Sequence, residues 1–262
     1  MRPVLSFSVR PRRVLLVLGA IIFMIVCFSV VGQYSAQMLG HGRLLGFVHG
    51  FNVDGEGNVP AHFSALMLLT ASILAGLIAS RVRRTEGPFY GHWVGLALVF
   101  VVLAADELNS FHERLIYPLR TLLDADGLLY FTWVVPGMVF VGLFVLAYAR
   151  FLWYLPTRWK TLFVVSGFTF VGGAIGVELL GGWYVSSYDP EAFTDSVVFI
   201  YALITTLEES LEMIGAATFL YALLDYLRAQ VGTVAVTLAA EEDDRDAAPP
   251  RPARRTPAET VA

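Results

Sequence analysis

The chain has 262 residues, of which 56% are hydrophobic and 15% are charged, and its formal net charge is -4. This composition is too apolar for an ordinary soluble domain and indicates a protein that crosses a membrane several times. The single cysteine, Cys27, excludes an intramolecular disulfide and a thiolate metal cluster, and no basic, aromatic-interleaved surface points to nucleic acid.

Six hydrophobic stretches are long enough to cross a bilayer as helices. The first follows an arginine-rich start and lacks a small-residue cleavage site, so we interpret it as a retained span rather than a signal peptide. The sequence therefore predicts an all-α polytopic membrane protein, a six-helix bundle over residues 14–228, with spans at 14–31, 61–80, 90–117, 129–151, 161–184 and 196–227.

Arginine and lysine alternate between the connections of these spans. They are frequent in the basic segment 1–13, in the second and fourth connections and after the last span, whereas the first and third connections carry one arginine each and the fifth carries none. Positive charge collects on the cytoplasmic side of membrane proteins, so both termini are predicted to be cytoplasmic. The preference for arginine over lysine hints at a GC-rich bacterial genome, and hence at the bacterial cytoplasmic membrane.

Two further segments are expected to lie outside the bundle. Residues 32–60 are rich in glycine and too polar to span, so they are predicted to form a long outer loop whose role the sequence leaves open. Residues 229–262 combine charge, proline and alanine without apolar periodicity, which is typical of a disordered tail, here on the cytoplasmic side.

The third span continues into the polar stretch ADELNSFHERL, residues 105–115. The next helix breaker is Pro118, so we expect the helix to continue to Tyr117. Helical spacing would then place Asp106 and Glu113 on one face, with His112 beside it. This span would carry several ionisable side chains through the outer half of the bilayer.

The fifth and sixth spans add more acids at comparable depth. Glu178 follows Gly172 and Gly176, which are four residues apart and are expected to let a neighbouring helix approach closely. In the sixth span the acids fall on one helical stripe, formed by Glu208, Glu209 and Glu212.

Buried acids need partners, because each charge at the centre of a bilayer costs about 2.5–3.5 kcal/mol. Isolated in lipid, the seven acids together would cost on the order of 20 kcal/mol; they are Asp106, Glu107, Glu113, Glu178, Glu208, Glu209 and Glu212. Shared protons, a water-filled cavity or bound cations could remove this cost. The sequence therefore predicts that several helices bring these side chains to one site.

Carboxylates with an imidazole form the ligand sets of iron, manganese and zinc sites. The leading hypothesis is a metal-dependent membrane enzyme, a hydrolase or an oxidoreductase that acts on a lipid-like substrate. The metal ligands would be Glu107, His112, Glu208, Glu209 and Glu212. Further ligands or general acid/base groups would be Asp106, Glu113 and Glu178. Membrane lipids are the expected surroundings and partners, and the oligomeric state is open.

Two other functions remain open. The acids could form the relay of a proton- or cation-coupled transporter, or a polar network that only holds the bundle together. Local alternatives also remain: Glu178 could pair with Arg114, and His62 could be a surface or capping residue. The Glu-x-x-His signature of ferritin-like metal sites is absent from the sequence, which argues against confident assignment to that class.

Overall fold

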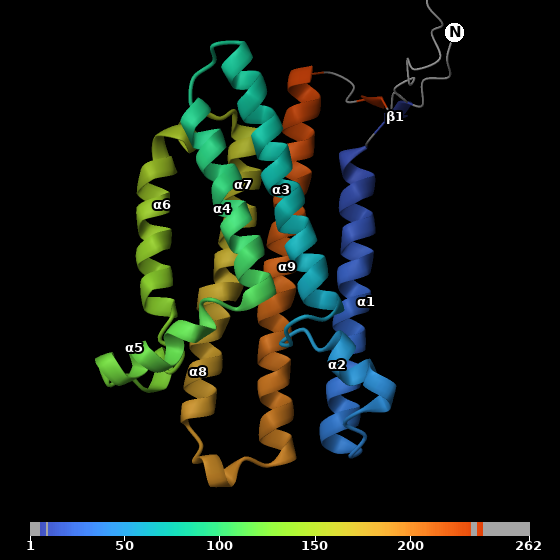
Figure 1. Cartoon of the computed structure of the whole chain (residues 1–262), viewed down its shortest axis with the longest axis vertical. Helices are drawn as coiled ribbons and strands as arrows, with labels where there is room; N and C mark the ends of the chain where they lie inside the picture. The colour runs from blue at the N-terminus through green and yellow to red at the C-terminus, as the bar shows by residue number, and fades with distance from the viewer. Residues whose placement is uncertain (1–5, 9, 232–234, 238–262) are drawn as a thin grey trace, which may run out of the picture.

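The computed structural model describes residues 6–8, 10–231 and 235–237, which are helical almost throughout (Figure 1). Within these described residues, five helical segments are long and apolar enough to cross a membrane. They are α1 (Pro11–Met38), α3 (Val59–Arg84), α4 (Tyr90–Asn109), α6 (Val134–Tyr154) and the continuous segment Thr157–Ser186. The lengths and composition of these helices confirm the prediction of an all-α, multi-pass membrane protein.

The segment Thr157–Ser186 has three parts: α7 (Thr157–Val171), a π-helical stretch η4 (Gly172–Val177) and α8 (Glu178–Ser186). The longest helix, α9 (Asp195–Val231), carries the three glutamates of the predicted sixth span. The connections contain shorter helices: η1 (Leu44–Gly46), α2 (Phe47–Phe51), η2 (Glu113–Leu115), α5 (Ile116–Leu123), η3 (Gly127–Leu129) and η5 (Pro190–Ala192).

Helix α9 is the central element of the bundle (Figure 1). It packs against α1, α3, α7, η4 and α8, while α4 packs mainly against α3. We call the end where α1 begins and α9 finishes the arginine-rich end, and the opposite end, with α2, α5 and the connection into α9, the loop end. At the arginine-rich end the strand β1 (Ser6–Ser8) pairs antiparallel with β2 (Ala235–Thr237), so the two described ends of the chain meet there.

Large aromatic side chains fill the bundle between its middle and the arginine-rich end. We call them the aromatic cluster: Trp93, Phe100, Phe151, Phe163, Phe219 and Tyr226. Their rings are in contact, with centroids 4.9 Å apart for Phe100 and Phe219 and 4.6 Å apart for Phe163 and Phe219. Such pairs add to the stabilisation that burial alone provides. Buried Met213 belongs to the same core.

The predicted third span, 90–117, is too long, because α4 ends at Asn109. Ser110 follows in a left-handed conformation with φ of 44° and donates its backbone N–H to the carbonyl of Asp106 (2.6 Å). The chain then reverses into η2 and α5. This break follows from local hydrogen bonding rather than from a glycine or a proline, so neither the apolar pattern nor Pro118 reveals it.

The predicted outer loop 32–60 is partly helical. Helix α1 continues to Met38, and η1 and α2 occupy part of the remainder. The loop is anchored to α1 at two points: Ser29 Oγ accepts the backbone N–H of Val53 (3.2 Å), and the Gln33 amide donates to Asn52 Oδ1 (2.6 Å). In the predicted tail 229–262, residues 229–231 continue α9 and 235–237 form β2, and the other positions lie outside the described residues.

Glycine allows close helix packing here, but at positions other than the two predicted. A Cβ placed on Gly172 or Gly176 would meet nothing within 4 Å, whereas one on Gly173 would lie 2.7 Å from the carbonyl oxygen of Glu208. On the α9 side, a Cβ on Gly215 would lie 2.7 Å from the backbone nitrogen of Phe170. The π-helical turn changes which residues face α9, so the four-residue spacing pointed to the wrong face.

Candidate functional site

The turn after α4 holds His112 against the helix it has just left. Asp106 accepts two hydrogen bonds from this residue, one from the backbone N–H to Oδ1 (3.0 Å) and one from the ring Nδ1 to Oδ2 (2.6 Å). The left-handed Ser110 makes this return possible. An imidazole held through Nδ1 leaves Nε2 as its reactive nitrogen, so the motif orients His112 for proton transfer or ligation.

A second set of contacts runs from His112 to α9. Its ring lies against the indole of Trp133 with centroids 4.5 Å apart, and Trp133 Nε1 donates to Glu178 Oε1 (2.7 Å). The carboxyl group of Glu178 in turn meets that of Glu208, side chain to side chain. Two carboxyl groups this close favour a shared proton or a bound cation, because two bare carboxylates would repel each other.

The acids of α9 continue the cluster toward α3 and α4. Glu208 is buried, with 8% of its surface exposed, while Glu209 and Glu212 are half-buried. Glu209 lies within electrostatic reach of Glu107, and Glu107 lies near the hydroxyl of Ser64 in α3. The backbone of η4 at Gly173 rests directly on the Glu208–Glu212 turn of α9. Side chains of α3, α4, α8 and α9 therefore gather in one region of the bundle.

The loop end supplies further charged groups. Asp54 and Glu113 keep exposed surface, but the protein around them removes part of their hydration. This loss of hydration and the nearby carboxylates of Glu113 and Glu178 raise the pKa of Asp54 to about 7. The same loss of hydration, with the negative charges of Glu56 and Asp106, raises the pKa of Glu113 and outweighs the opposing effect of His112. These two loop acids therefore favour the protonated form more than free carboxyl groups do, which extends the cluster from the membrane-crossing helices to the loop.

The pKa of His112 is raised, which favours the charged form of the ring. Burial opposes the imidazolium, but the hydrogen bond and negative charge of Asp106, with Glu113 and Glu178 adding to them, outweigh burial and raise the pKa of His112. The imidazolium, a positive partner for the surrounding acids, therefore persists to higher pH than in a free histidine. A raised histidine pKa stabilises the folded protein below its ordinary value of 6.5, and this contribution is lost as pH rises through the folded pKa.

Replacing Asp106 with Asn tests this assignment. The amide oxygen can still accept the backbone N–H of His112, but the charge and the ring hydrogen bond are lost, so the pKa of His112 should fall to its ordinary 6.5 or below. A titration of the ¹⁵N-labelled histidines by NMR, with His112→Gln to assign the signal, measures it. Glu113→Gln, which removes charge alone, should give a smaller decrease, and an unchanged His112 in the Asp106 variant would contradict the pairing.

The cluster does not form a ready metal site. Within residues 6–8, 10–231 and 235–237, no three His, Cys, Asp or Glu side chains are arranged to hold one ion. The donor types still suit the chemistry of iron, manganese or zinc, but binding would require the side chains to move closer together. The predicted ligands Glu107, His112, Glu208, Glu209 and Glu212 are therefore neighbours in a cluster rather than a formed coordination shell.

The structure brings the predicted residues into one region and adds others that the sequence did not single out. Trp133, Asp54 and Ser64 come from outside the predicted acid-bearing stretches, and only the presence of Asp54 in a polar loop gave any signal. The structure does not form the alternative pairing of Glu178 with Arg114. Glu178 accepts from Trp133, and Arg114 donates to the carbonyl oxygen of Asn109 (3.1 Å). The ring Nδ1 of His62 contacts the carbonyl oxygen of Asn58 (2.6 Å), a local contact at the start of α3.

Comparison with protein families gives a match over most of the chain. The model of a family described as a domain of unknown function (DUF8692) matches residues 15–227. The chain belongs to this family. The matched region extends from the first turns of α1 almost to the end of α9 and includes every residue of the cluster. No curated protein and no solved structure matched the chain in the same comparisons.

Proposed function

We propose that the protein crosses the bacterial cytoplasmic membrane six times, with both termini cytoplasmic. The five apolar helical segments would leave the two ends on opposite sides, yet β1 and β2 pair with each other. An even number of crossings requires α9 to cross as well. Its 37 residues extend about 55 Å, well beyond a hydrocarbon core of roughly 30 Å. The arginine-rich end then faces the cytoplasm.

Within this topology, the site is proposed to take up and release protons as part of a proton- or cation-coupled transporter. The observation that carries this proposal is the carboxyl–carboxyl contact between Glu178 and Glu208. A proton bound between them would remove their repulsion, and the neighbouring acids Glu209, Glu212 and Glu107 offer further positions for protons. Intramembrane acids grouped in this way are typical of proton pathways.

The residues around the cluster support an exchange of protons with the outer side of the membrane. The loop acids Asp54 and Glu113 lie between the cluster and the loop end, and they interact with Glu178 or His112. Toward the cytoplasm, Phe219 follows Glu212 by seven residues, about 10 Å along α9, and packs on Phe100 and Phe163. The aromatic cluster would therefore act as the barrier that transport must open.

A metal-dependent enzyme that acts on a lipid-like substrate is the second candidate. It is favoured by the Asp106–His112 pair, because metal-bound histidines usually donate their other ring nitrogen to a carboxylate in this way. Iron, manganese or zinc would supply hydrolytic or oxygen chemistry. Glu107, Glu208, Glu209 and Glu212 would complete the ligand set after rearrangement, with Asp106, Glu113 and Glu178 as ligands or acid/base groups.

One pair of measurements separates these candidates. Infrared difference spectra of the reconstituted protein between acidic and alkaline pH report protonated carboxyl groups, and mass spectrometry reports bound metal. The comparison is wild type against Glu178→Gln/Glu208→Gln, with exposed Glu191→Gln as the control. We expect a carboxyl signal that the double variant loses and the control keeps. In proteoliposomes, the wild type and the control should transport protons, and the double variant should not.

The other outcomes decide against the proposal. Near-stoichiometric metal that the double variant loses would assign the site to the metalloenzyme instead. A protein without metal whose carboxyl signal does not change with pH or with the substitution would leave the acids as a structural network, and both functional candidates would be wrong.

A further inference from the structure

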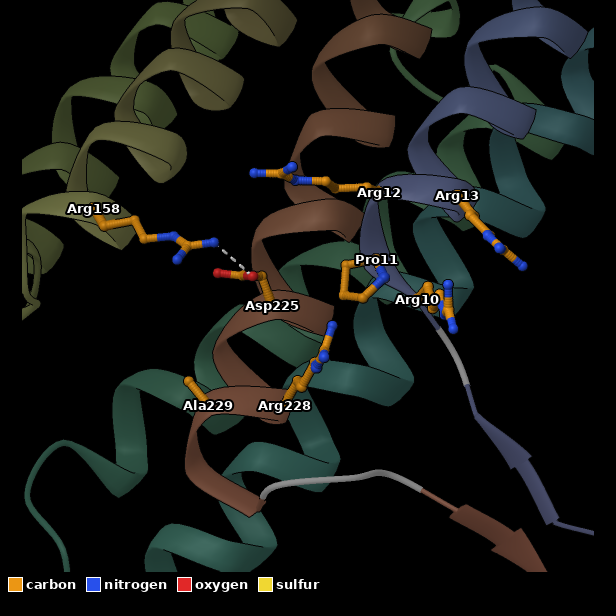
Figure 2. Close-up of a pocket in the computed structure, with 8 residues that line it drawn as sticks. All are labelled: Arg10, Pro11, Arg12, Arg13, Arg158, Asp225, Arg228 and Ala229. Carbon is orange, nitrogen blue, oxygen red and sulfur yellow. Dashed lines mark hydrogen bonds and ion pairs between the residues drawn. The ribbon is translucent and has the colours of Figure 1, made fainter.

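A pocket at the arginine-rich end lies apart from the acid cluster and is not used by the proposed function. Its volume is about 620 Å³. The start of α1, the start of α7 and the end of α9 form its walls (Figure 2). The lining residues are Arg10, Pro11, Arg12, Arg13, Arg158, Asp225, Arg228 and Ala229. Three helices that are distant in sequence thus bring Arg12, Arg158 and Arg228 to one space, while the side chains of Arg10 and Arg13 at its rim point away from it (Figure 2).

Asp225, the single acid among the lining residues, already accepts hydrogen bonds from the protein. Asp225 accepts from Arg158 at 2.7 Å and from Trp159 Nε1 at 3.0 Å, so it fixes the position of Arg158 and neutralises one charge. In the part of the chain that the structure describes, the other four arginines of the lining have no second acid among the residues of the pocket. The positive end of the α1 dipole adds to this field, because the first turn of α1 forms one wall.

Arginine is suited to phosphate rather than to anions in general. Its planar guanidinium can donate two parallel hydrogen bonds to phosphate oxygens, and such charge-assisted bonds are the strong ones. Figure 2 shows Arg12 extending from α1 toward the side of Arg158, and Arg228 extending from α9 toward Pro11. A phosphate group in the pocket would meet guanidinium groups from more than one helix.

The pocket is continuous with a surface that faces lipid. Along α9, helical spacing places Leu207, Ile214 and Tyr221 on the same stripe as Asp225 and Arg228. Leu207 is 53% exposed and Ile214 is 44% exposed, so no other part of the described chain covers this stripe at these positions. An exposed apolar stripe that ends at a basic pocket matches a molecule with acyl chains and a phosphate-bearing headgroup.

We propose that this pocket binds the phosphate-bearing headgroup of an anionic phospholipid from the cytoplasmic leaflet, with the acyl chains lying along the exposed stripe of α9. Basic pockets between helices on the cytoplasmic side commonly take such headgroups. The positive-inside rule accounts for arginines at this end of the bundle, but it does not require them to converge on one pocket. A lipid held here would bridge α1, α7 and α9, the helix that carries the acid cluster.

Native mass spectrometry of the full chain in detergent tests the proposal. The probes are phosphatidylglycerol and phosphatidylcholine, and the variant is Arg12→Gln/Arg228→Gln. The matched control is Arg83→Gln/Arg84→Gln, which removes the same charge from the same end of the bundle outside the pocket. We expect the wild type and the control to retain phosphatidylglycerol preferentially, and the pocket variant to bind it about tenfold more weakly.

Two further arms make the result specific. Arg12→Lys/Arg228→Lys keeps the charge but cannot form bidentate hydrogen bonds to phosphate. Its affinity for the lipid should therefore fall between those of the wild type and the glutamine variant. Inorganic phosphate and glycerol 3-phosphate should compete only weakly, since they lack acyl chains. Equal losses in the pocket variant and the control, no preference over phosphatidylcholine, or displacement by free phosphate at the affinity of the lipid would each overturn the proposal.

Discussion

Replacing Gly215 with Ala should destabilise the protein, because the added methyl group would collide with the backbone of α7. The new Cβ would lie 2.7 Å from the backbone nitrogen, 2.8 Å from Cβ and 2.9 Å from Cα of Phe170. Backbone atoms cannot rotate away, so α7 and α9 would have to separate. Overpacking of this kind costs about 1–3 kcal/mol, which exceeds the gain of about 1 kcal/mol that alanine has over glycine in a helix.

Thermal unfolding of the purified protein, followed by circular dichroism, measures this effect. Gly173→Ala should show a similar loss, because its Cβ would lie 2.7 Å from the carbonyl oxygen of Glu208. Gly172→Ala is the control, since its Cβ meets nothing within 4 Å one residue away in the same π-helical turn. If Gly172→Ala were as damaging as Gly215→Ala, the close approach of η4 and α7 to α9 would be wrong.

The same glycines show what the sequence could and could not predict about the fold. The helical spans follow from apolar length, which is a local property, and five of them appear close to their predicted positions. Which glycine touches a neighbour depends on the rotation of the helix, and the π-helical turn Gly172–Val177 changes that rotation without a distinctive sequence signal. The spacing of Gly172 and Gly176 therefore predicted a close contact but located it one residue away from where it occurs.

The end of α4 illustrates a second limit. Nothing in ADELNSFHERL breaks a helix by composition, and the prediction carried the helix to Tyr117. The chain instead turns at Ser110, because Asp106 accepts both the backbone N–H and the ring nitrogen of His112. A side chain that bonds six residues ahead competes with the helix, and this competition is settled only when the surrounding groups are in place.

The sequence predicted which acids belong to the candidate site, but not which residues they contact. Charges in a membrane are costly, so acids on several spans had to meet, and the acids of α4, α8 and α9 do meet. The contacts with Trp133 and Asp54 come from connections whose paths the sequence pattern does not define. Binding of iron, manganese or zinc stays a prediction, and so do the roles assigned to the individual acids.

Replacing Glu178 with Ala should be the most damaging change within the site. It removes the acceptor of the Trp133 indole N–H and the carboxyl partner of Glu208, and Glu208 is buried at 8% exposure. A buried polar group that loses its partner costs about 1–3 kcal/mol. Glu178→Gln should instead keep near wild-type stability, because its amide oxygen can accept from Trp133 while its amide nitrogen donates to Glu208.

The contrast between these two variants separates structure from protonation. Thermal unfolding should rank Glu178→Ala well below Glu178→Gln, with Glu191→Ala, an exposed acid of the loop end, unchanged. Trp133→Phe removes the donor of the same hydrogen bond, so combining it with Glu178→Ala should cost less than the two single losses added together. Equal damage from the alanine and glutamine variants would mean that Glu178 needs its negative charge. The shared proton between Glu178 and Glu208 would then be wrong, and a bound cation would have to take its place.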